Sequence, residues 1–227
     1  MIELTDVYKV YPNNHSALKG INVNISEGEF VFIIGPSGAG KSTILKLLLR
    51  EISATSGTVK VNGYNLHKIR DSRIPYFRRT LGVIFQDFRL IPEMTVYENV
   101  AFALRAIGSS KKVVEKHVPS VLSIVGLSQK HNSLPGELSA GEQQRTALAR
   151  AIVNAPDLII ADEPTGNVDP KMSQDIMKLL VEINNLGTTV VVVTHDRQLV
   201  DQYKKRVISI RSGKVVDDRI GGYYDGE

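Results

Sequence analysis

Phe-Val-Phe-Ile-Ile-Gly-Pro-Ser-Gly-Ala-Gly-Lys-Ser, residues 30–42, is the stretch that decides the fold. Its first five residues are continuously apolar, as is typical of a strand buried on both faces of a sheet. Its last eight match a glycine-rich pattern that joins such a strand to a helix through a tight loop. This combination predicts an α/β fold, in which helices cover both faces of a mostly parallel sheet.

The glycine-rich loop predicts a nucleoside triphosphate site, and hence a P-loop NTPase core. Glycines let main-chain N–H groups close around the β-phosphate, and the positive end of the following helix faces the same phosphate. Lys41 adds positive charge, and Ser42 offers its hydroxyl to Mg²⁺. A chance glycine-rich turn is the weaker explanation, because the expected strand and helix flank the loop. The residues expected to bind nucleotide here are Gly35, Pro36, Ser37, Gly38, Ala39, Gly40, Lys41, Ser42 and Thr43.

Strand signals place this loop within a larger sheet and an antiparallel flank. Buried strands are expected at 158–161 and 189–193, followed by a hairpin at 207–216. The flank is expected from strands at 2–11, 21–25 and 58–61, with Asn62-Gly63 as a hairpin turn.

Between residues 87 and 134 the strand signals vanish, and helical periods appear at 96–107 and 113–125. We therefore expect one domain, with a nucleotide-binding core and its flank at 1–86 and 138–227 and an inserted helical subdomain at 87–137. Residues 221–227 are expected to form a mobile tail.

The composition excludes several functional classes. With 42% hydrophobic and 23% charged residues, the 227-residue chain has the composition of an ordinary globular protein. It contains no cysteine, which excludes disulfides, thiolate metal sites and cysteine nucleophiles. A net charge of +4 is too weak to indicate nucleic-acid binding, and none is expected.

The sequence also gives no sign of export or of a membrane span. Two acids, Glu3 and Asp6, stand where a secretory signal would be basic and then apolar, so no such signal is expected. The longest apolar runs fall far short of the roughly 20 residues that span a bilayer. Any contact with a membrane is therefore expected to depend on a partner.

A second motif, Asp162-Glu163, ends the apolar run at 158–161. An acid at this place helps hold Mg²⁺, and a following carboxylate can deprotonate or orient water. We therefore expect Asp162 to be a metal residue and Glu163 the general base, although acids also end strands without any catalytic role. The pair favours hydrolysis over transfer to a second substrate.

A third motif covers residues 138–145, where Ser139 and Glu142 have the spacing of a capping box that starts a helix through Val153. Capping alone explains this pattern. A capped helix start with small residues is also an anion site, and the phosphate-binding loop already has a helix of its own. A second site of this kind suggests that it serves the nucleotide of another molecule.

Along the chain the phosphate-binding loop comes first, then residues 138–142, then Asp162-Glu163. In this order the three motifs resemble the nucleotide-binding subunit of the ATP-binding cassette (ABC) family over essentially the whole chain. The resemblance implies an ATPase that forms a head-to-tail homodimer when ATP is bound, with two composite sites related by C₂ symmetry. It also implies that Ser139 and Gly141 of one copy contact the γ-phosphate held by Lys41 of the other. The further roles it implies are adenine stacking for Tyr11, Mg²⁺ and water sensing for Gln86, γ-phosphate contact for His195 and an interface position for Asp169.

Some of these residues have simpler alternatives. Tyr8 competes with Tyr11 for the stacking role, and Asp169 before Pro170 also fits a helix cap. His195 follows a buried strand at the edge where α/β sheets bind ligands, whereas His15, His67, His117 and His131 read as structural or surface residues. One position departs from the family pattern, because Ala140 stands where the family usually has the first of two glycines. This departure puts the tightness of dimer closure in doubt.

Within the family, residues 83–92, 95–102 and 151–154 are most similar to members that act in cell division. That similarity implies a cytoplasmic ATPase bound to an integral membrane protein, which regulates cell-wall hydrolases. Phe88, Leu90 and Ile91 would then lie where the partner docks, or else pack inside the helical subdomain. Two rivals stay open, namely a subunit of a lipoprotein or drug exporter and a soluble cassette protein that acts on nucleic acid or ribosomes.

Overall fold

A six-stranded sheet forms the centre of the fold in the computed structural model, which describes residues 1–222; the part of the predicted tail at 223–227 lies outside the described residues. All neighbouring strands pair in parallel except the two strands nearest the end of the chain, which form the predicted hairpin. In spatial order the strands are β10 (Lys214–Ile220), β9 (Arg206–Arg211), β3 (Phe30–Ile34), β8 (Thr189–Val193), β7 (Leu158–Asp162) and β6 (Leu81–Ile84). The predicted α/β fold with a mostly parallel sheet is confirmed.

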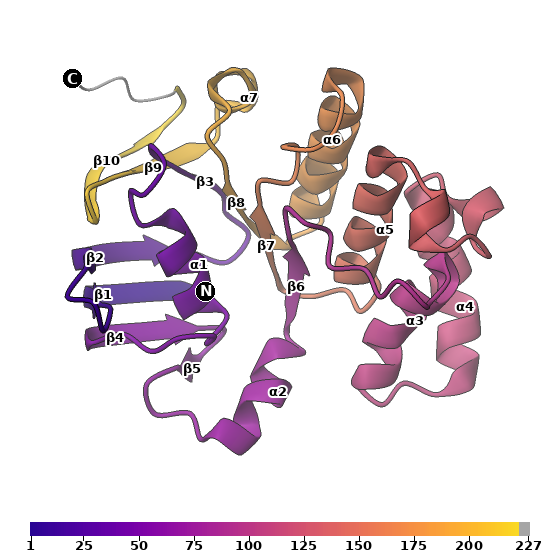
Figure 1. The fold of residues 1–227 in the computed structure, drawn as a ribbon, viewed down its shortest axis with the longest axis horizontal. Helices are drawn as coiled ribbons and strands as arrows, with labels where there is room; N and C mark the ends of the chain where they lie inside the picture. The colour runs from indigo at the N-terminus through magenta and orange to yellow at the C-terminus, as the bar shows by residue number, and fades with distance from the viewer. Residues whose placement is uncertain (223–227) are drawn as a thin grey trace.

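A second sheet of four antiparallel strands lies beside the first, as predicted for the flank (Figure 1). Asn62 and Gly63 both have positive φ, 48° and 77°, as a two-residue turn of this kind requires. The strands are β2 (Ser16–Ile25), β1 (Ile2–Val10), β4 (Ser56–Val61) and β5 (Tyr64–Asn65).

Helices complete the layers on both faces of the central sheet. Helix α1 (Lys41–Leu48) lies between the two sheets, and α5 and α6 lie on the opposite side of the central sheet (Figure 1). Helices α3 and α4 pack against α5, farther from the sheet. They cover the two ranges in which helical periods are expected. The remaining bounds are α2 (Ile74–Arg78), α3 (Val96–Ala106), α4 (Lys111–Ile124), α5 (Ala140–Ile152), α6 (Pro170–Asn185), α7 (Arg197–Tyr203) and short 3₁₀ turns at 71–73, 128–130 and 135–137.

The two hydrophobic cores follow from the two-residue period of the central strands. In β3, Phe30, Phe32 and Ile34 point into the core shared with α3 to α6. Val31 and Ile33 point into the core shared with α1 and the antiparallel sheet. This explains why residues 30–34 are apolar without interruption. Among residues 1–222, no helix combines the length and the apolar character that crossing a bilayer requires.

Candidate active site

Four loops meet at one edge of the central sheet, where β3, β6, β7 and β8 end. Carboxyl ends of parallel strands lie together, so these loops bring together residues far apart in the sequence. They enclose much of a pocket of about 620 Å³, here called the nucleotide pocket. Of the predicted site residues, those that line this pocket are Tyr11, Gly35, Pro36, Ser37, Gly38, Gly40, Lys41, Ser42, Thr43, Gln86, Asp162, Glu163 and His195. Ala39, in the same glycine-rich loop, is buried and does not line it.

Two glycines of the phosphate-binding loop are required by the protein's own main chain. At Gly35 (φ 151°) an added Cβ would lie 2.1 Å from the Ile210 carbonyl oxygen, and at Gly40 (φ 113°) it would lie 2.9 Å from the Ala17 carbonyl oxygen. The N–H of Gly213, in the β9–β10 turn, donates to the Ala39 carbonyl at 2.9 Å. The loop is therefore held from below by β2 and by the last hairpin.

Lys41 is bound to the main chain of its own loop. Its Nζ donates to the carbonyl oxygens of Gly35 at 2.6 Å and Pro36 at 3.1 Å. Burial lowers the pKa of Lys41, and the nearby Glu163 and Asp162 oppose this shift. Helix α1 has no side-chain cap at Gly40, so its first N–H groups remain available to an anion.

Glu163 and His195 are brought into direct contact. Glu163 has a left-handed backbone (φ 44°), its N–H donates to the Val193 carbonyl at 2.9 Å, and its Oε1 lies 2.6 Å from His195 Nδ1. This geometry fits a carboxylate whose direction is set by a neighbouring ring. Beside it, burial raises the pKa of Asp162, the charge of Glu163 raises it further, and Lys41 opposes the shift.

The donors near Asp162 suit a hard cation that also binds phosphate. Ser42, Gln86 and Asp162 all line the nucleotide pocket and offer a hydroxyl, an amide and a carboxylate oxygen. Within residues 1–222, no cluster of three or more acids, histidines or cysteines forms a metal site by itself. Mg²⁺ is usually held by one or two carboxylates plus substrate phosphates and water, so these residues fit Mg²⁺ carried with a nucleotide.

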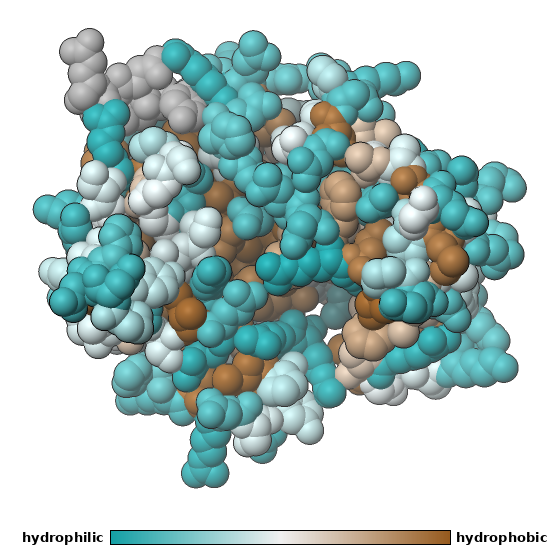
Figure 2. Space-filling view, in the orientation of Figure 1, coloured by the Kyte–Doolittle hydropathy of each residue, from teal (hydrophilic) through white to brown (hydrophobic). Residues whose placement is uncertain are grey.

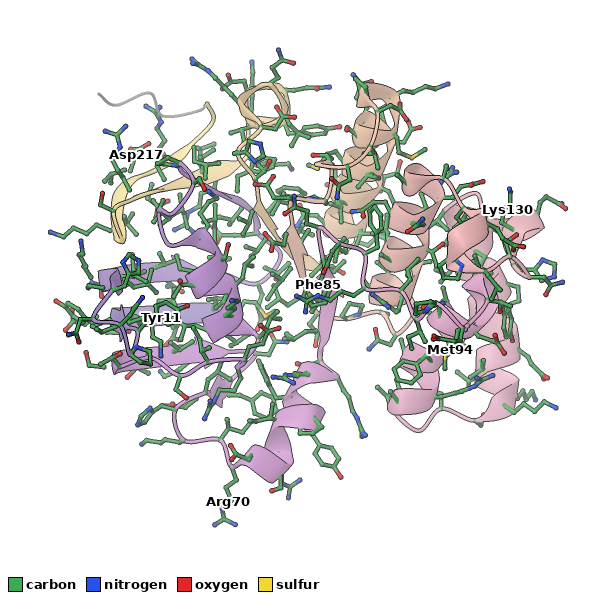
Figure 3. All side chains as sticks on the ribbon, in the orientation of Figure 1. Tyr11, Arg70, Phe85, Met94, Lys130 and Asp217 are labelled. Atoms are coloured by element: carbon green, nitrogen blue, oxygen red, sulfur yellow. The ribbon has the colours of Figure 1, made fainter. Side chains whose placement is uncertain are left out.

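The aromatic wall of the pocket includes His15, which was predicted to be a structural or surface residue. Tyr11, labelled in Figure 3, places its hydroxyl 3.3 Å from Thr43 Oγ1. Its ring stacks with His15 at a centroid separation of 6.5 Å, and both rings line the pocket. Tyr8 lies on β1 outside this lining. In the sequence, only the closeness of His15 to Tyr11, at the β1–β2 connection, indicates that His15 reaches this pocket.

Ser139, Gly141 and Asp169 do not line the nucleotide pocket of their own chain. The Ser139 hydroxyl accepts from the Glu142 N–H at 3.3 Å, and the Glu142 carboxylate accepts from the Ser139 N–H at 2.9 Å, which completes the predicted capping box. Asp169 caps α6 by accepting from two N–H groups, as its simpler alternative expects. One chain therefore presents the α5 N-terminus away from its own phosphate-binding loop.

An α/β core with a phosphate-binding loop and an Asp-Glu pair at a strand end defines the class of P-loop ATPases. The family model described as ABC transporter matches residues 18–166. The chain therefore belongs to the ABC transporter family and is an ATP-binding ATPase of that family.

Similar proteins include the cell division ATP-binding protein FtsE of Bacillus subtilis (strain 168), which is 53% identical over 224 residues, covering 99% of this chain and 98% of the relative. The protein of the same name from Mycobacterium tuberculosis is 52% identical over 225 residues, with the same coverage. Among solved structures, a dimeric post-hydrolysis ATP-binding cassette bound to ADP and Pi has a TM-score of 0.90 and 37% identity, covering 99% of this chain and 100% of that one. A dimeric bacterial ABC transporter cassette has the same TM-score and coverage at 38% identity.

Proposed function

We propose that this chain is the ATPase subunit of a cell-division complex, in which ATP-driven pairing of two copies regulates cell-wall hydrolysis through an integral membrane partner of the FtsX type. The subunit would lie in the cytoplasm, on the inner face of the plasma membrane, held there by that partner. The names of the full-length relatives support the cell-division role.

The observation that carries the pairing proposal is the divided site. The phosphate-binding loop, Glu163 and His195 line one pocket, while the exposed Ser139 at the start of α5 lies outside it. A head-to-tail dimer would place the α5 N-terminus of one copy against the γ-phosphate in the other, where its N–H groups stabilise negative charge. Ala140 is exposed at the same helix start, on the side that the second copy would cover.

Each residue of the pocket then has a chemical task. Lys41 and the phosphate-binding loop hold the β- and γ-phosphates, and Tyr11 stacks on adenine. Ser42, Gln86 and Asp162 would hold Mg²⁺, which neutralises phosphate charge when bound. Glu163 directs the attacking water and accepts its proton, while His195 fixes the direction of the Glu163 carboxylate and reaches toward the γ-phosphate.

An apolar groove on the same molecule suits the membrane partner. It has a volume of about 550 Å³, lies between α2, α3 and the end of β6, and is lined by the apolar residues Phe85, Ile91, Phe102 and Ile107 and by the arginines Arg78, Arg79, Arg89 and Arg150. Figure 2 shows apolar surface and a hollow in this region, and Figure 3 labels Phe85, which lines the groove at the end of β6. We expect an amphipathic partner segment with acidic residues to dock here.

The proposed docking residues after Gln86 are only partly in this groove. Ile91 lines it, whereas Phe88 and Leu90 are half-buried and belong to neither hydrophobic core of the described chain. Helices α3 and α4 would form the helical subdomain at 87–137 that moves with the partner.

Pairing is tested by sedimentation of two variants with and without ATP. Glu163→Gln should bind ATP normally, hydrolyse it roughly 10² to 10⁴-fold more slowly because the general base is lost, and sediment as a dimer with ATP. Lys41→Ala should remain monomeric under the same conditions. Wild-type turnover in Glu163→Gln, or no nucleotide-dependent association, would contradict the proposal.

A further inference from the structure

The loop after Gln86 contains two successive residues in the left-handed conformation. Phe88 has φ 59° and Arg89 has φ 48°, a backbone that residues other than glycine seldom adopt. The main-chain carbonyl oxygens of these two residues lie within hydrogen-bond reach of one and the same side chain. A side chain that binds both oxygens at once fixes this unusual backbone in one arrangement.

Arg150 is that side chain. Its Nη2 donates to the Phe88 carbonyl at 2.7 Å and its Nη1 donates to the Arg89 carbonyl at 2.5 Å. A planar guanidinium presents two parallel N–H donors, which suits a pair of oxygens better than a single ammonium does. Arg150 lies in the last turn of α5, the helix whose first turn carries Gly141.

The same loop is held at its other end by Asn167. The Asn167 Nδ2 donates to the main-chain carbonyl of Gln86 at 2.8 Å, from the turn that follows Glu163. That turn is fastened to α5 as well, because the buried Gln144 donates from Nε2 to the Pro164 carbonyl at 2.7 Å. The loops that carry Gln86 and Glu163 are thus tied to each other and to one helix.

We propose that Arg150 and Asn167 are positioning residues that hold Gln86 toward Ser42 and Asp162 in the nucleotide pocket. This inference rests on the proposed role of Gln86 at Mg²⁺. Neither side chain lines the site at which Mg²⁺ would bind, so each acts through the main chain of residues 86–89. Loss of the Arg150 or Asn167 hydrogen bonds leaves the nucleotide contacts of the phosphate-binding loop in place. It makes only the side-chain amide of Gln86 less well positioned.

The test measures the Mg²⁺ requirement separately from nucleotide affinity, using the full chain and a fluorescent ATP analogue. Arg150→Met should raise the Mg²⁺ concentration needed for half-maximal metal-dependent binding by roughly 10 to 100-fold, the usual effect of losing an outer-shell partner. Affinity for the analogue in EDTA should not change. Asn167→Ala should act in the same direction. Arg105→Met is the matched control, because Arg105 occupies the last turn of the neighbouring helix α3 and is exposed.

Chemical rescue separates positioning from general damage. Millimolar guanidinium should lower the Mg²⁺ concentration needed for half-maximal binding by Arg150→Ala back toward the wild-type value. It should not lower the concentration that Gln86→Ala needs. Arg150→Lys, which keeps the charge and loses the planar pair of donors, should fall between wild type and Arg150→Met, and it serves if the larger changes fail to fold.

Two results would overturn the inference in different ways. A shifted Mg²⁺ requirement in Gln86→Ala, with none in the Arg150 and Asn167 variants, refutes the positioning role alone. An unshifted requirement in Gln86→Ala refutes the proposed role of Gln86, and the positioning inference falls with it.

Discussion

At the scale of the residue, Asp162 shows how a functional group lowers the stability of the folded protein. Burial and the adjacent Glu163 both raise the pKa of Asp162, so the native state disfavours its ionised form. In the unfolded chain the same carboxyl has an ordinary pKa. As the pH rises from that ordinary value through the raised one, the native state loses stability relative to the unfolded state. The proposed role of Asp162 in binding Mg²⁺ accounts for a carboxylate at a position where it lowers folding stability.

Asp162→Asn should therefore raise the melting temperature of the nucleotide-free protein at neutral pH. The gain should shrink as the pH falls through the raised pKa, because the wild-type carboxyl is then neutral as well. Thermal melts across pH values measure this difference, with Asp157→Asn as the control, since Asp157 is exposed and lies just before the same strand. Added Mg²⁺ and ATP should stabilise wild type more than Asp162→Asn. A lower melting temperature for Asp162→Asn at neutral pH would contradict the expectation.

At the scale of the element, two helices begin with the same chemistry. Thr95 and Glu98 start α3 with a capping box, as Ser139 and Glu142 start α5. Capping therefore explains how both helices begin, and it does not explain why only α5 is proposed to meet a phosphate. The difference lies in placement, since α5 presents its exposed start at the surface that a second copy would cover.

Ser139→Asp should separate capping from phosphate contact. Aspartate caps a helix about as well as serine, but it cannot donate to Glu142 as the Ser139 hydroxyl does at 3.1 Å, and it brings two carboxylates together. We therefore expect the free energy of unfolding to fall by about 0.5 to 1 kcal/mol. The negative charge of the aspartate would oppose the γ-phosphate of the other copy, so ATP-dependent dimerisation should be lost. Urea unfolding and sedimentation measure the two effects. Thr95→Asp places an aspartate at the N-cap of α3, where the Thr95 hydroxyl likewise donates to Glu98 at 3.1 Å. It should lose a similar free energy of unfolding and keep ATP-dependent dimerisation, and equal loss of dimerisation in the two variants would refute the assignment.

At the scale of the whole molecule, the divided site predicts complementation between copies. A mixed dimer of Lys41→Ala and Ser139→Asp chains would contain one site with both changes and one site with neither. Neither variant is expected to pair with itself, so every dimer that forms is mixed and has one intact site of two. We therefore expect up to about half of wild-type ATPase activity where each variant alone is inactive. Activity is measured as phosphate release at increasing mixing ratios. A mixture as inactive as its components would indicate that each chain builds its site alone.

The features predicted from sequence are those that neighbouring residues encode. Uninterrupted apolar residues at 30–34, the glycine pattern after them and the strand-end acids at 162–163 led to the sheet and to the pocket's main residues. The contacts that were missed join distant elements: Arg150 lies 61 residues from Arg89, and Asn167 lies 81 residues from Gln86. His15 is an omission of another kind, because it lies only four residues from Tyr11 and a lone histidine in a connection indicates no ligand by itself. An arginine in a helix or an asparagine after a strand has no local pattern that names its partner.

The hydrogen bond from Gly213 to Ala39 has a consequence for biosynthesis. Residues 35–42 are supported by the β9–β10 turn, which is synthesised more than 160 residues after them. Contacts between such distant segments form only once both have been translated. We therefore expect a nascent polypeptide to bind ATP only after the β9–β10 turn has emerged, so that products which stop before this turn do not pair with finished ones.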